Sequence, residues 1–145
     1  MYKIIACIEE KPTLTPKKYR YLLKNACLPK VQAAFKPFST IGVATKIVKN
    51  LVPGSDLYIF SPPSTEPSAP QPVYVYLPAS FVGINPDIFT IICKTICHQS
   101  QTMVAAIPYP LAPEHPISEQ LATATSAYEQ LHDTASEYNI NPQQI

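Results

Sequence analysis

The chain has 145 residues, and its 11 lysines and arginines against 10 aspartates and glutamates leave a formal net charge of +1. This length is enough for one domain with a hydrophobic core, and the balanced charge argues against nucleic acid or an anionic membrane as a partner. Charged residues make up only 14% of the chain, well below the usual share. Such a surface favours either a chain that a partner partly covers or one of poor solubility.

The cysteines lie in apolar surroundings, without the spacing of a zinc knuckle. They are Cys7, Cys27, Cys93 and Cys97. A reduced cytoplasmic protein without a cofactor is the simplest interpretation. The opening apolar run, Ile4–Ile8, precedes Glu9 and is too short for a signal peptide or a membrane span.

Residues 1–38 are predicted to form a short helical, cap-like N-terminal region. Thr15 and Pro16 have the order expected of an N-cap and the first helical position, where the missing N–H of proline costs nothing. Pro29 is expected to end this helix.

A series of β-strands is expected next. Ala44–Val52 and Leu57–Phe60 are separated by the turn residues 53–56 and predict a hairpin. The proline-rich residues 61–72 predict an exposed, stiff connection. Val73–Leu77 is then a strongly β-prone run.

Helices and a further strand alternate in the remaining residues. Asn85 and Pro86 are expected to start a helix, Thr102–Ile107 to form a buried strand, and Ser118 to cap a longer helix. Apolar residues at helical spacing predict the buried face of each helix. These faces are Ile88, Ile91, Ile92 and Ile96 in the first, and Leu121, Ala124, Tyr128, Leu131, Ala135 and Tyr138 in the second.

This order of elements predicts the α/β fold class. Strand–helix–strand–helix at these lengths indicates crossover units and parallel strands, with the hairpin as an antiparallel edge. We therefore expect two regions, the helical residues 1–38 and a core of residues 39–145.

The second region resembles the N-terminal half of hormone-sensitive-lipase-like carboxylesterases, which have the α/β-hydrolase fold. Leu111–Pro116, Leu-Ala-Pro-Glu-His-Pro, is identical to a family segment. Pro72–Tyr76 resembles the third strand of the family, and Asn139–Ile145 resembles the segment that leads into its nucleophile strand. The resemblance implies a partial α/β-hydrolase sheet and hydrolysis of small acyl esters through an acyl-enzyme.

The same comparison shows where this sequence departs from the family. Family members carry His-Gly-Gly-Gly after the third strand, whose backbone N–H groups hold the oxyanion. Here the corresponding residues include Pro78, Ala79 and Ser80. Proline has no N–H, and alanine and serine adopt positive φ less readily than glycine, so Ala79 and Ser80 mark a degenerate oxyanion loop. The family's Asp-Tyr-Arg is here Pro108–Pro110.

The nucleophile elbow requires Gly-x-Ser-x-Gly. The glycines, Gly42, Gly54 and Gly83, are never four residues apart. By resemblance, the serine, acid and histidine of the triad would follow Ile145, so no catalytic residue is expected in this chain.

Two other groups could carry chemistry. Cys93, Cys97 and His98 could form a metal or redox site, but cysteines one helical turn apart in apolar surroundings favour the core. His115 could act as a general base, although a structural role in a proline-rich turn is favoured. His132 is expected to be solvated.

Two functions are consistent with these features. The first is a segment of a split, interrupted or degenerate esterase, inactive alone, with a complementary C-terminal hydrolase polypeptide as partner. The alternative is a non-catalytic interaction module, a pseudoenzyme on a hydrolase scaffold. It would self-associate or bind a partner through the edge of Val73–Leu77, because unpaired strand edges recruit other strands.

Overall fold

The computed structural model describes residues 42–63, 69–78 and 86–145, together with Thr15, Lys18, Tyr21 and Ala33. The predicted N-terminal helical region and its boundary with the core therefore lie almost wholly outside the described residues. The described residues include a contact within that region. The Lys18 N–H donates to Thr15 Oγ1 at 3.4 Å, in the arrangement of the N-cap predicted there.

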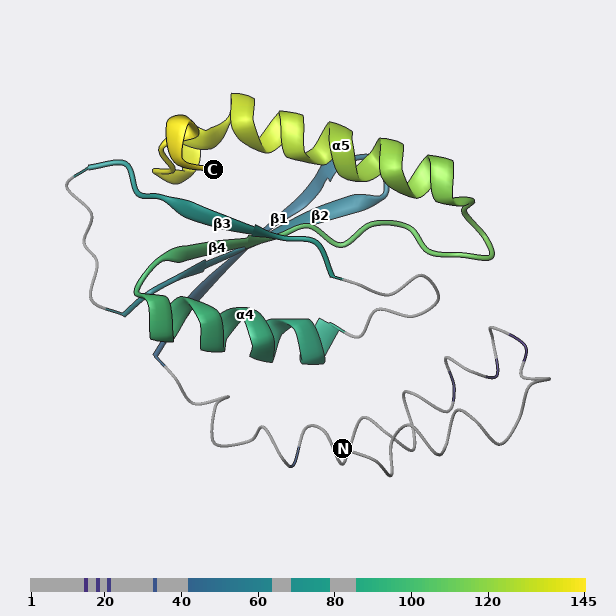
Figure 1. Ribbon diagram of the computed structural model, residues 1–145, viewed down its shortest axis with the longest axis horizontal. Helices are drawn as coiled ribbons and strands as arrows, with labels where there is room; N and C mark the ends of the chain where they lie inside the picture. Colours follow the sequence, from purple (N-terminus) through teal and green to yellow (C-terminus); the bar gives the residue numbers. More distant parts are fainter. Residues whose placement is uncertain are drawn as a thin grey trace.

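The core is a mixed sheet with helices on both faces, which confirms the predicted α/β class (Figure 1). The strands stand in the order β1-β2-β4-β3. The elements are β1 (Ala44–Val52), β2 (Ser55–Ser61), β3 (Val73–Tyr76), α4 (Pro86–Ser100), β4 (Met103–Ala106), α5 (Ile117–Asp133) and the short 3-10 helices η3 (Ala135–Tyr138) and η4 (Pro142–Gln144). In the part of the chain that is described, each helix falls short of the length and hydrophobicity needed to cross a bilayer.

The β1–β2 hairpin forms the antiparallel side of the sheet, as predicted. Its turn uses Gly54 at φ +83°, a conformation that glycine adopts without strain. The Lys49 ammonium contacts Asp56 Oδ2 at 2.6 Å, and the Asn50 N–H donates to Asp56 Oδ1 at 3.0 Å. The hydrogen bond from Lys49, followed by that from Asn50, lowers the pKa of Asp56 below its ordinary value.

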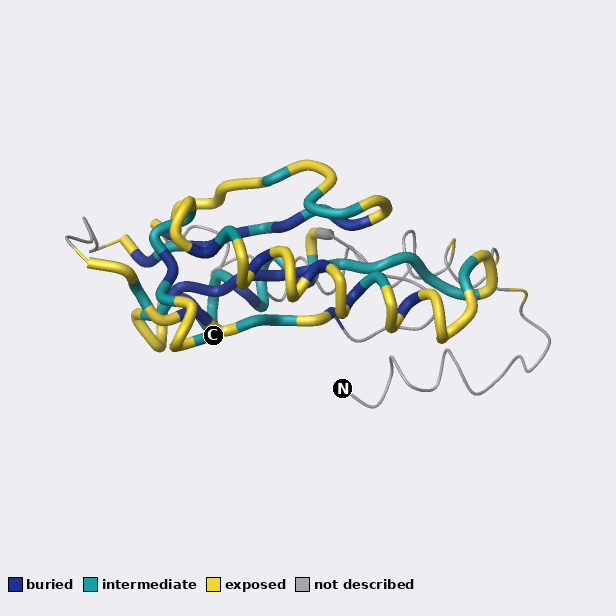
Figure 2. The backbone as a smooth tube through the Cα atoms, turned by 90° about the horizontal axis from the view of Figure 1, so that it is seen from above, coloured by how far each residue is buried: buried dark blue, intermediate teal, exposed yellow. Residues whose placement is uncertain are grey.

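Strands β3 and β4 are parallel, and α4 is the crossover between them. The crossover confirms the sequence interpretation of a βαβ unit. Strand β4 is buried along its whole length because it lies between β2 and β3 with a helix on each face (Figure 2). Its short apolar run, without alternation, is the pattern of such a strand.

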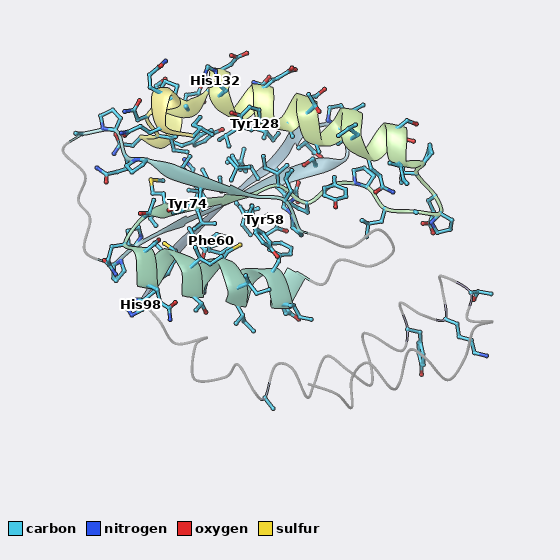
Figure 3. The ribbon with its side chains drawn as sticks, in the orientation of Figure 1. Tyr58, Phe60, Tyr74, His98, Tyr128 and His132 are labelled. Atoms are coloured by element: carbon cyan, nitrogen blue, oxygen red, sulfur yellow. The ribbon has the colours of Figure 1, made fainter. Side chains whose placement is uncertain are left out.

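The alternation of side chains divides the core into two layers. Met103 and Ala105 of β4 face α5, together with Leu57 and Ile59 of β2. Val104 and Ala106 face α4, as do Tyr58 and Phe60. Figure 3 shows Tyr58 and Phe60 on the α4 side of the sheet, where the Tyr58 ring meets Phe89 edge to face at 5.1 Å.

The predicted buried faces of both helices need correction. In α4 the fully buried seam is Phe89, Cys93 and Cys97, whereas the four isoleucines are only half-buried. Periodicity locates an apolar helix but does not distinguish neighbouring stripes when several are apolar. Cys93 and Cys97 are core residues, as predicted, with no exposed surface.

In α5 the buried residues are Gln120, Ala124, Ala127 and Leu131. Leu121 and Tyr128 were predicted to be buried but are 67% and 41% exposed. The helix begins at Ile117 after Pro116, with no side-chain cap, so Ser118 lies within the first turn and is not the N-cap. Small residues pack closer to the sheet than Leu121 would allow, which rotates the helix away from the predicted face.

Candidate functional site

The carboxyl ends of β3 and β4 meet at one edge of the sheet because the two strands are parallel. Their register pairs Tyr76 with Ala106, and the Ile107 N–H donates to the Tyr76 carbonyl at 3.0 Å. In open α/β sheets, ligands bind outside the carboxyl ends of the strands. The segments that follow Tyr76 and Ile107 therefore define the candidate site.

The segment after β4 is anchored to the hairpin turn. Ser55 is 2% exposed, and its hydroxyl donates to the Pro108 carbonyl at 2.7 Å. A Cβ at Gly54 would lie 3.2 Å from Pro110 Cγ, so the turn and the proline are closely packed. Pro108 and Pro110 thus stand against the β1–β2 turn. Sequence reasoning did not identify this role of Ser55, which joins residues 53 positions apart.

The family-like segment Leu111–Pro116 forms a compact turn that leads directly into α5. The Ala112–Pro113 peptide bond is cis, and the His115 N–H donates to the Leu111 carbonyl at 3.1 Å. The Pro116 carbonyl accepts from the N–H groups of Glu119 and Gln120. Leu111, Ala112 and His115 are half-buried, whereas Pro113, Glu114 and Pro116 are exposed.

His115 is held at its backbone and at its ring. Its carbonyl accepts a hydrogen bond from Gln120 Nε2 at 2.9 Å, and its Nδ1 lies 2.6 Å from Glu119 Oε1. The ring contact is between side chains that are 40% and 50% exposed, so it contributes little to stability. The hydrogen bond to the His115 carbonyl comes from the Gln120 side chain, which is 3% exposed. This geometry is consistent with the structural role favoured for His115, which stays a prediction.

Gln120 is a site residue that sequence reasoning missed. The apolar spacing predicts that its neighbour Leu121 is buried, and glutamine is rarely buried. The observation that could have indicated it is its position after the proline-rich segment, since buried polar side chains are used to satisfy backbone groups in such turns.

The alternative site at Cys93, Cys97 and His98 does not form. Burial, and secondarily the neighbouring Cys97, raises the pKa of Cys93 to about 12. Burial raises the pKa of Cys97 to about 11. Both remain protonated and are poor metal ligands and nucleophiles, while His98 lies exposed on the outer side of α4 (Figure 3). Within the ranges described, no cluster of three His, Cys, Asp or Glu residues could hold a metal ion.

The segment after β3 is described as far as Pro78, which is buried. Ala79 and Ser80, the predicted oxyanion loop, lie outside the described residues, and their role stays a prediction. Tyr76 precedes this loop. Burial, with smaller effects of Cys93 and Tyr109, raises the pKa of its hydroxyl. His132 is exposed on the outer side of α5, as expected (Figure 3).

The far edge of β3 carries a second feature. Gln71 forms a parallel bridge with Ile140, in which the Gln71 N–H donates to the Asn139 carbonyl at 2.9 Å and the Asn141 N–H donates to the Gln71 carbonyl at 2.8 Å. Backbone groups of successive strand residues point to opposite edges. Since the Tyr76 carbonyl faces β4, those of Gln71, Val73 and Val75 face away from it. Beyond the Gln71 bridge, no strand of the described residues pairs with this edge.

Residues 78–145 match a protein family described as alpha/beta hydrolase fold. No curated protein sequence matches the chain significantly. Among solved structures, the fold is similar to a hyperthermophilic esterase from the archaeon Pyrobaculum calidifontis, with a TM-score of 0.70 and 18% identity over 97% of this chain and 44% of that one. It is also similar to the esterase LipW from Mycobacterium marinum, with a TM-score of 0.69 and 21% identity over 90% of this chain and 41% of that one.

A thermophilic carboxylesterase cloned from a metagenomic library gives a TM-score of 0.66 and 19% identity over 93% of this chain. The resemblance inferred from the sequence is therefore confirmed as a partial match. The chain spans less than half the length of these esterases. Over that part, the chain has the α/β-hydrolase fold of these structures.

Proposed function

We propose that residues 42–145 supply the first half of the core of a serine carboxylesterase, and that hydrolysis of small acyl esters requires a complementary hydrolase segment. The observation that carries this proposal is the parallel bridge between Gln71 and Ile140. This bridge orients the chain at Ile140 parallel to β3. Ile140 lies at the edge of β3 where the backbone groups of Val73 and Val75 point outward.

A strand that continued in this direction would end beside Leu77 and Pro78. In α/β-hydrolases the nucleophilic serine stands on a sharp turn after such a strand, and the oxyanion hole takes one N–H from the loop after β3. The added strand would therefore place its serine next to Ala79 and Ser80. The carboxyl ends of β3 and β4, with the Leu111–Pro116 turn behind them, would form one side of the site.

On this proposal, the present residues shape the site but do not perform the chemistry. The sequence contains no Gly-x-Ser-x-Gly, so the serine, acid and histidine belong to the complementary segment. The oxyanion loop lacks the glycines of the family, and the loss of one oxyanion donor typically costs a factor of about 10²–10³ in rate. The completed enzyme is accordingly expected to be slow.

A second candidate function is a non-catalytic interaction module that pairs through the β3 edge. The observation in its favour is exposed apolar surface beside that edge. Tyr74 is 57% exposed and Leu77 is 45% exposed. Apolar surface next to an unpaired strand is typical of sites at which another polypeptide adds a strand.

Fragment complementation separates the two functions. The purified chain alone is expected to hydrolyse p-nitrophenyl acetate no faster than buffer. Addition of the C-terminal part of the Mycobacterium marinum esterase, the portion this chain does not cover, should restore measurable hydrolysis. The same portion with its nucleophilic serine replaced by alanine is the control and should restore none.

Three outcomes decide between the candidates. Hydrolysis that appears only in the mixture supports the esterase proposal. Binding of the two polypeptides without hydrolysis supports the interaction module. Hydrolysis by this chain alone, surviving purification, would contradict the proposal that the chemistry lies in another segment.

A further inference from the structure

The strand at the open edge has a sequence that is nearly the same in both directions. Residues 72–78 are Pro-Val-Tyr-Val-Tyr-Leu-Pro. About Val75 as centre, tyrosine faces tyrosine, valine faces leucine, and a proline stands at each end. A strand of this kind is self-complementary in an antiparallel pairing with itself, because each side chain meets one of its own class.

The unpaired part of the β3 edge is also centred on Val75. The backbone groups of Gln71 are already bonded to Asn139 and Asn141, so the part of the edge that no described strand pairs begins at Val73. Val73 and Val75 direct their N–H and C=O groups outward, whereas Tyr74 and Tyr76 direct theirs towards β4. Continued alternation would direct those of Leu77 outward as well. A two-fold axis through Val75 would therefore pair the whole open edge, from Val73 to Leu77, and stop where the Ile140 bridge begins.

The two edges of the sheet differ in how they are protected. β1 carries Lys46 and Lys49, and its register is broken between Val48 and Val52, with Asn50 at φ 51°. Lysines and bulges are the devices by which edge strands avoid association. Residues 69–78 contain no charged side chain, so two copies would meet there without repulsion.

We propose that a second copy of this chain pairs with β3 in an antiparallel, two-fold arrangement centred on Val75. Val75 pairs with the same residue of the second copy, Val73 with Leu77, and Tyr74 with Tyr76. The two sheets join into one continuous sheet, with like helices on like faces. This inference rests on the second candidate function and names its partner.

Side-chain exposure agrees with this register. Tyr74 is exposed although it lies on the same side of the sheet as α4, because α4 lies mainly over β4 and β2. In the pair, each Tyr74 ring would lie beside Tyr76 of the other copy. Aromatic pairs across strands are among the most favourable cross-strand contacts.

The test uses the full chain and two measurements. Sedimentation velocity over a wide concentration range should show a monomer–dimer equilibrium. Tyr74→Glu should weaken the dimer by about tenfold or more, because it removes two aromatic pairs and brings two carboxylates to diagonal positions on one face. Tyr128→Glu introduces the same change at an exposed tyrosine of α5 and should leave the equilibrium unchanged.

Amide hydrogen exchange gives a readout that needs no variant. The amides of Val73, Val75 and Leu77 should become protected as concentration rises. Those of Tyr74 and Tyr76, which face β4, should be protected at every concentration and serve as the internal reference. A chain that is monomeric at all concentrations would overturn the inference. So would a dimer in which Val75 stays unprotected and Tyr74→Glu has no effect.

The result is independent of the esterase proposal. A monomeric chain that still restores hydrolysis with a complementary segment overturns only the dimer. A dimer that yields no hydrolysis on complementation overturns only the esterase. If both hold, the complementary segment competes for the β3 edge, and hydrolysis should appear as the dimer disappears.

Discussion

Replacement of Gln120 tests whether its hydrogen bond from helix α5 stabilises the Leu111–Pro116 turn. The side chain is 3% exposed and donates to the His115 carbonyl at 2.9 Å. In Gln120→Ala the carbonyl loses its donor, which costs about 1–3 kcal/mol for a buried group. The lost methylene adds about 0.8 kcal/mol. The expected loss in the free energy of unfolding is therefore about 2–4 kcal/mol.

Urea denaturation followed by circular dichroism measures this loss. With a denaturant slope of about 2 kcal/mol/M, the midpoint should fall by about 1–2 M. Gln120→Met keeps most of the volume and removes only the donor, so its loss should be about 1–3 kcal/mol. Gln130→Ala, at an exposed position of the same helix, should change stability by no more than about 0.5 kcal/mol.

Hydrogen exchange locates the effect. The His115 amide, which donates to Leu111, should exchange faster in both Gln120 variants, while the amides of β4 should change only as much as global stability does. A Gln120→Met variant as stable as the original chain would refute the reasoning. It would show that the hydrogen bond to His115 is not what holds the turn.

Three further predictions concern the core and its charges. Leu131→Ala should cost about 2–5 kcal/mol and Leu121→Ala less than about 0.5 kcal/mol, measured by urea denaturation; equal losses would contradict the orientation given for α5. The lowered pKa of Asp56 gives stability that is present above the ordinary carboxyl pKa and is lost as pH falls through the pKa of the folded protein. Asp56→Asn should therefore reduce the loss of unfolding free energy between neutral and acidic pH. The same loss in the variant and the original chain would count against the ion pair. Cys93 and Cys97 should resist a thiol reagent at pH 8 until the protein is unfolded, in a variant with serine at the other two cysteines; rapid labelling of the native state would show that the thiols are accessible.

Alternation and turn residues determined much of the sheet from sequence. The hairpin, the strand at Val73 and the buried strand within Thr102–Ile107 all form as predicted, because alternation, short β-prone apolar runs and proline boundaries are local signals. Leu111–Pro116 predicted the resemblance to α/β-hydrolases from sequence identity alone. These features depend on neighbours in the chain and need no knowledge of what lies across the core.

Helix orientation could not be obtained in the same way. Leu121 and Tyr128 have the spacing of a buried face, yet they are exposed. The smaller side chains of Ala124 and Ala127 pack against the sheet instead. Which stripe is buried depends on the shape of the opposing layer, and this is absent from any local pattern. For the same reason, the spacing of the four isoleucines of α4 predicts more burial than the structure shows.

The sequence by itself determined the order of elements, the class of fold and the lack of a nucleophile elbow. Only the tertiary structure decided which groups meet. It brought Ser55 to Pro108 and Gln71 to Ile140 across more than fifty residues of chain, and it turned the buried amide of Gln120 towards His115. Contacts of this kind depend on the packing of both layers against one sheet, so their partners become identifiable only when the chain has folded.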